Sequence, residues 1–220
     1  MKMTKIPSIL FTTNRRESND WLLEKRNKFE KRWNKNGDGK KLIKRIMRVC
    51  NLPFPKDIIT LTVNMKRYVH KKCKGTYGCI EDVNVPDRIT LYIRKKDRYL
   101  DLRKTLCHEI VHSLFWSNTK HDERRTVTSF FADIFADELL TTLLEAYVIK
   151  GKLTYGDYEW ALDYAKKDTC TKLENLKRKS DYRHILNELK EYFITFNKNI
   201  KNGSNALVER QRVLEDISAP

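Results

Sequence analysis

The spacing of apolar residues changes along the chain, and this change restricts the fold more than any other feature. Between Asp20 and about Asn34, and again over residues 40–50, apolar side chains recur at helical spacing. Two β-branched runs follow at 57–64 and 88–93, and the stretch CKGTYGCI between them could add a further strand. Helices that precede and follow a few strands predict an α+β fold with a small sheet.

The second half of the sequence is mainly helical in pattern. Long helices are expected at about 99–116 and 120–150, and two or three shorter ones over 154–200. Residues 1–18 look irregular, and the last 20 residues are expected to be a loosely attached end. We expect three parts, namely an N-terminal helical segment, a central domain with the sheet and a C-terminal helical segment: residues 1–56, 57–150 and 151–220.

Composition restricts the partners and the compartment. The 220 residues carry a net charge of +16. This charge indicates an anionic binding partner, such as nucleic acid bound without sequence preference. The alternative is that the charge is spread over solvated faces of the protein. The five cysteines show no disulfide-type spacing, and no signal peptide or membrane-spanning apolar run is present. We therefore expect a cytoplasmic protein that does not associate with membranes.

The stretch CHEIVH, inside the expected helix 99–116, carries the strongest chemical signal. Residues four apart lie one above the other on a helix, so His108 and His112 present two imidazoles to one point. That arrangement suits a Zn²⁺ ion, which prefers tetrahedral nitrogen ligands. Neighbouring apolar residues such as Ile110 and Leu114 predict that the opposite face is packed, with the histidines on the less apolar side.

Glu109 adds a catalytic group beside this pair. A carboxylate next to the metal, but not bound to it, can accept a proton from water and later return it to a leaving amine. The sequence therefore predicts zinc-dependent peptide hydrolysis, with His108 and His112 as metal ligands and Glu109 as general base. An endopeptidase is favoured over an exopeptidase.

The stretches TLCHEIVHSLFW and FFADIFADELL together resemble the zincin metallopeptidases. The chain is similar over about residues 57–145 to the minimal gluzincins of archaea and to the ImmA/IrrE-type peptidases of bacteria and phages. The residues that match the second helix of those families are Ala132, Asp133, Phe135, Ala136, Leu139 and Leu140. The resemblance implies a zincin-like fold, with an active-site helix followed by a helix that supplies the third zinc ligand.

The third ligand departs from the family pattern. Where those families carry a glutamate this chain has Ser129, whose neutral hydroxyl is a poor zinc ligand. Asp133, one helical turn later, is the preferred replacement. His121 is the next choice, through a weaker likeness to SprT-type and WLM-type peptidases, and Glu123 and Glu138 follow. Because of Ser129, the alternative is a catalytically inactive zinc-binding or nucleic-acid-associated regulatory protein.

Overall fold

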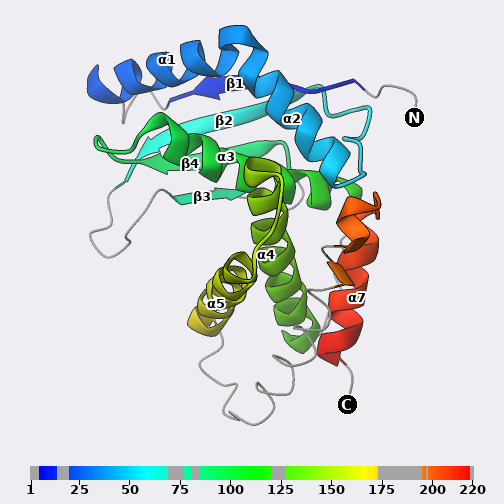
Figure 1. The fold of residues 1–220 in the computed structure, drawn as a ribbon. Helices are drawn as coiled ribbons and strands as arrows, with labels where there is room; N and C mark the ends of the chain where they lie inside the picture. Colours follow the sequence, from blue (N-terminus) through cyan, green and yellow to red (C-terminus); the bar gives the residue numbers. More distant parts are fainter. Residues whose placement is uncertain are drawn as a thin grey trace. The chain divides into compact units, whose positions relative to one another are not determined.

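A computed structural model describes residues 5–13, 20–68, 77–80, 85–119, 127–172, 195–196 and 198–218, and Figure 1 shows its ribbon. The chain divides into two compact units. The first unit consists of Met1–Arg48 and Pro53–His121, and the second of Val49–Leu52 and Asp122–Pro220. Helices and strands are both present, so the expected α+β class is confirmed.

A four-stranded sheet forms the centre of the first unit. Its strands are β1 (Ser8–Thr12), β2 (Thr60–Arg67), β3 (Tyr77–Ile80) and β4 (Arg88–Ile93). The order across the sheet is β1-β2-β4-β3, in which β1, β2 and β4 run parallel and β3 pairs antiparallel with β4. The strands expected at 57–64 and 88–93 are therefore confirmed, the first displaced by three residues.

The expectation that residues 1–18 are irregular is wrong, because β1 occupies part of them. This strand has five residues, and it is held by parallel pairing with β2, in which Leu10 lies opposite Thr62. Its side chains give little signal, since Phe11 is buried while Leu10 is 52% exposed. A short edge strand depends on its neighbour for stability, and the neighbour lies about fifty residues away in sequence.

The described part of the first unit also holds three longer helices, α1 (Asp20–Asn34), α2 (Asp38–Val49) and α3 (Tyr99–Asn118). Helix α1 packs against β1 and β2, and α3 packs against β3 and β4. The short 3-10 turn η1 (Lys35–Gly37) separates α1 from α2, and positive φ angles at Asn36 and Gly37 produce the change of direction there. The break that the sequence predicts between these helices is confirmed.

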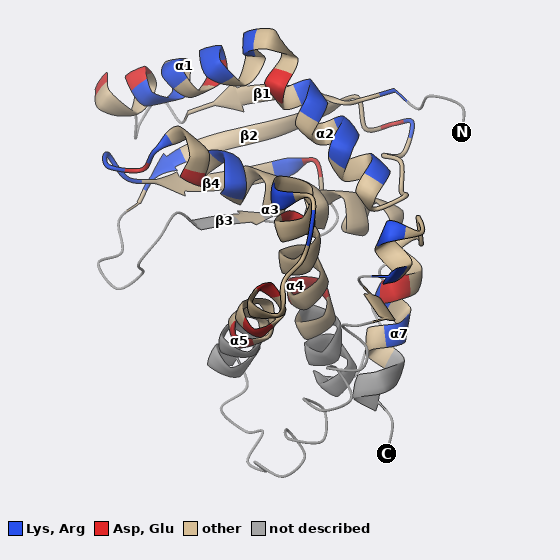
Figure 2. Ribbon diagram, in the orientation of Figure 1, with Lys and Arg blue, Asp and Glu red and all other residues tan. Residues whose placement is uncertain are grey.

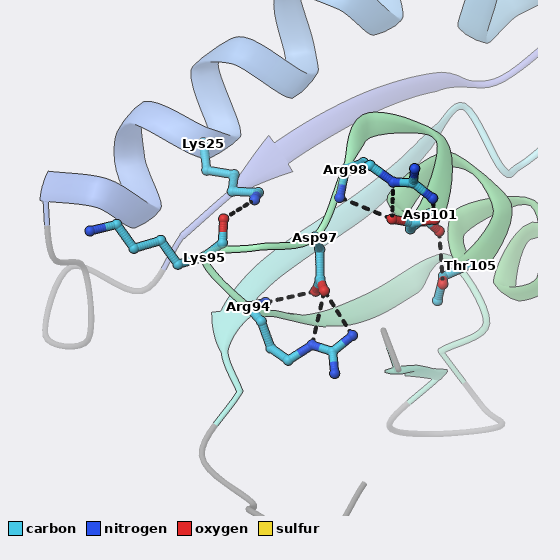
Figure 3. A network of polar contacts seen from close by, with 7 residues as sticks. All are labelled: Lys25, Arg94, Lys95, Asp97, Arg98, Asp101 and Thr105. Carbon is cyan, nitrogen blue, oxygen red and sulfur yellow. Dashed lines mark hydrogen bonds and ion pairs between the residues drawn. The ribbon is translucent and has the colours of Figure 1, made fainter. Parts of the chain in front are cut away.

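The turn between β4 and α3 is fixed by charged side chains (Figure 3). Asp97 is buried and accepts hydrogen bonds from the Arg94 backbone N–H at 2.8 Å and from the Arg94 guanidinium Nε at 2.9 Å. Lys25 on α1 donates its ammonium hydrogen to the carbonyl oxygen of Lys95, at 2.6 Å. The turn is thereby tied to α1 as well as to the sheet.

The first turn of α3 is closed by Asp101. Its carboxylate accepts the Arg98 backbone N–H at 3.1 Å and the Arg98 guanidinium Nε at 3.2 Å (Figure 3). These hydrogen bonds from Arg98 hold the pKa of Asp101 below its usual value. An acid in the first turn also complements the helix dipole. The helix that carries the CHEIVH motif therefore begins at a defined residue.

The second unit is helical in its described part, with α4 (Val127–Lys150), α5 (Tyr155–Lys172) and α7 (Ala206–Ser218). Helix α4 packs against both α5 and α7. Arg210 of α7 forms a buried ion pair with Asp137 of α4. Since Ala206 and Val213 are also fully buried, the expectation of a loosely attached C-terminal end is wrong.

Among the helices that the structure describes, none combines the length and the apolar character needed to cross a bilayer.

Candidate metal centre

The CHEIVH motif lies in the middle of α3, at its most buried part. Every residue from Leu106 to Phe115 is buried. His108 is 8% exposed, Glu109 5% and His112 5%. The expectation that the opposite, apolar face of this helix is packed is confirmed, and the histidines are buried as well. Polar groups buried in this way require partners, and a metal ion is one partner that two imidazoles can share.

The two imidazoles face one another. Their Nε2 atoms are 3.1 Å apart, and the ring planes are inclined at 74°. Two nitrogens that share a tetrahedral zinc ion at about 2.0–2.1 Å stand about 3.3 Å apart. The observed separation is close to this value, so the pair needs little adjustment to share an ion.

Glu138, one of the four candidates for the third ligand, lies on α4 in the second unit and is half-buried. Two imidazoles and a carboxylate form a donor set that Zn²⁺ accepts in catalytic sites. His108, His112 and Glu138 are donors of these types and could therefore hold a metal ion.

The other candidates for the third ligand are not tested. His121 and Glu123 lie outside the described residues. Ser129 and Asp133 lie on α4, but their side chains are likewise outside the described part of the chain. The preference for Asp133 stays a prediction.

An aromatic ring borders the histidine pair on α3. The ring of Trp116 lies 5.7 Å from that of His112, measured between centroids, and is tilted by 46°. Trp116 is one helical turn beyond His112, so the contact follows from the spacing alone. Because Trp116 is only half-buried, it lies where the buried part of the helix meets more accessible surface.

No protein-family model, curated protein or solved structure matches this chain. The case for function therefore depends on the residues and on their geometry.

Proposed function

We propose that this protein is a zinc-dependent metallopeptidase of zincin-like fold, more specifically an endopeptidase. The observation that carries the proposal is the buried pair of imidazole nitrogens 3.1 Å apart on α3, with a buried carboxylate adjacent in sequence. His108 and His112 would hold the zinc ion, and Glu109 would handle the proton.

The zinc ion and Glu109 would have separate roles in the proposed reaction. Bound zinc supplies a Lewis acid that polarises a peptide carbonyl and makes water more acidic. Glu109 accepts the proton that the attacking water loses, and then delivers it to the amine that leaves. One carboxylate can perform both steps, because the first leaves it protonated and the second restores its charge. Burial of Glu109 keeps bulk water from competing for this proton.

We assign the third ligand to α4, with Asp133 as the first choice, one helical turn after Ser129, and Glu138 as the alternative. Asp133→Ala should then lower zinc affinity strongly, while Glu138→Ala leaves it nearly unchanged. Competition with a chromogenic zinc chelator measures both. The reverse order would move the assignment to Glu138, and the histidine pair would remain as ligands.

The metal itself is tested by elemental analysis of the purified protein. The wild type should contain about one zinc per chain, and His112→Ala should lose it, since two ligands rarely hold a catalytic zinc ion. His184→Ala is the matched control for loss of a histidine and should keep the metal. Equal zinc content in wild type and His112→Ala would refute the site.

A further inference from the structure

The excess of positive over negative charge in this protein falls in its first unit. Of the 45 Lys and Arg residues 29 fall in the first unit, against 12 of the 29 Asp and Glu residues. The second unit holds the other 16 basic and 17 acidic residues, and is close to neutral. An excess of charge on one part of a chain indicates a surface for an anionic partner.

Within the first unit, Lys and Arg gather over α1, α2 and the turn between β4 and α3 (Figure 2). Two recesses, of about 370 and 470 Å³, are lined by side chains of these elements. They share Arg32 and Tyr99, so they adjoin one another, and we refer to the two recesses together as the basic groove. The groove is lined by seven basic and two acidic side chains.

Both acids of the basic groove are matched by basic neighbours. Arg103 binds Asp38 at 3.1 Å, and Lys28 forms an ion pair with Glu24. The excess of positive charge therefore comes from the other five basic side chains, which are Lys25, Arg32, Lys35, Lys41 and Lys95. Four of these are exposed, so their ammonium and guanidinium groups can reach an anion in the groove. Lys25 is half-buried, and its ammonium donates to the Lys95 carbonyl oxygen.

Aromatic rings lie among these cations. Trp21 is half-buried and lines the first recess. The ring of Tyr99 is covered by the Arg32 guanidinium at 4.2 Å, and its hydroxyl donates to Asp38 at 2.7 Å. Tyr99 is therefore occupied in holding Arg32 in place, which leaves the indole of Trp21 as the surface on which a flat ligand can stack.

We propose that the basic groove binds single-stranded nucleic acid, with phosphates on Arg32, Lys35 and Lys95 and a base stacked on Trp21. A basic groove that follows the phosphate backbone, combined with an aromatic platform, is the arrangement that binds single strands without sequence preference. The base has to be unpaired, because a base inside a duplex does not offer its face. A lipid surface fits less well, since it is flat and would leave a recess of this size unfilled.

The test measures binding of a fluorescein-labelled oligothymidylate of about 20 nucleotides by fluorescence anisotropy, over a range of salt concentrations. A metal chelator is present throughout, so the result does not depend on the zinc site. The wild type should bind, and its affinity should fall as salt rises. Removing three phosphate contacts in the triple variant Arg32→Gln/Lys35→Gln/Lys95→Gln should reduce the slope of log K against log salt by about 2.

A matched control removes the same charge from the same unit outside the groove. Lys40, Lys44 and Arg48 are exposed on α2 and line neither recess. The variant Lys40→Gln/Lys44→Gln/Arg48→Gln should change the slope by much less than the groove variant. Equal effects would show that the charge acts diffusely, and would overturn the proposal.

Trp21→Leu separates stacking from charge. It should weaken binding by about fivefold or more while leaving the salt slope unchanged, because no phosphate contact is lost. If the variants fail to fold, photocrosslinking of a bromouridine-substituted strand to wild-type protein replaces them, with the adduct expected on Trp21. The proposal is overturned if the wild type does not bind the oligonucleotide at low salt, or if the crosslink forms at a residue other than Trp21. It is also overturned if the protein binds phosphatidylserine vesicles or polyglutamate but not the oligonucleotide.

Discussion

Replacing Gly39 with alanine should destabilise the first unit, although the same change normally stabilises a helix. Gly39 lies in the first turn of α2, where alanine would gain up to about 1 kcal/mol of helix propensity. A Cβ atom there would however lie 1.9 Å from Nε1 and 2.1 Å from Cε2 of Trp33. The indole cannot easily move, because it stacks on Phe29 at 5.9 Å and meets Phe11 edge-on at 6.0 Å.

Overpacking of this kind costs about 1–3 kcal/mol, and contacts this short place the cost at the upper end. The net loss in free energy of unfolding should therefore be about 2 kcal/mol, measured by urea denaturation. Gly156→Ala on α5 is the control, because the nearest atom to its new Cβ would be Thr154 Oγ1 at 3.9 Å, an ordinary van der Waals distance. That variant should be neutral or stabilised. The cost of Gly39→Ala should also shrink in a Trp33→Phe background. A stabilised Gly39→Ala protein would refute the packing described for α1 and α2.

Two further predictions concern buried polar groups. Asp157, in the first turn of α5, accepts the Thr154 backbone N–H at 2.9 Å and its hydroxyl at 2.7 Å. Asp157→Ala should therefore cost about 1 kcal/mol through loss of this capping box. Burial opposes ionisation of Asp157, but hydrogen bonds from Lys150 and Thr154 outweigh it and leave the pKa lowered. The stabilisation is therefore present above about pH 4 and lost as the pH falls through the folded pKa, so urea midpoints of wild type and variant should converge in acid. Burial raises the pKa of Cys50 to about 12, so iodoacetamide at neutral pH should label it only after unfolding, as mass spectrometry would show.

Local patterns predicted much of the fold, because they act within a few residues. The helix expected from Asp20 to about Asn34 is confirmed as α1, and the strand expected at 88–93 is confirmed as β4. In both cases periodic apolar residues bounded by turn-forming residues carry the signal. Strand β1 was not predicted, because its stability depends on pairing with β2, which periodicity within the segment cannot reveal.

The same distinction applies to the candidate metal centre. The pairing of His108 with His112 could be predicted, since helix geometry alone places residues i and i+4 together. Their burial could not, because it depends on how separate elements pack around α3. The third ligand has no fixed spacing from this pair, and for that reason the sequence leaves four candidates open.

The most direct test of the proposed hydrolysis is the comparison of wild type with Glu109→Gln. The substitution keeps the shape of the side chain but removes the carboxylate that accepts the proton. Cleavage of a quenched fluorescent peptide library should fall by about 10²–10⁴-fold, while zinc content stays at that of the wild type. His184→Ala again serves as the control. Undiminished cleavage by Glu109→Gln, or no cleavage by zinc-loaded wild type, would contradict the assignment of this protein as a peptidase.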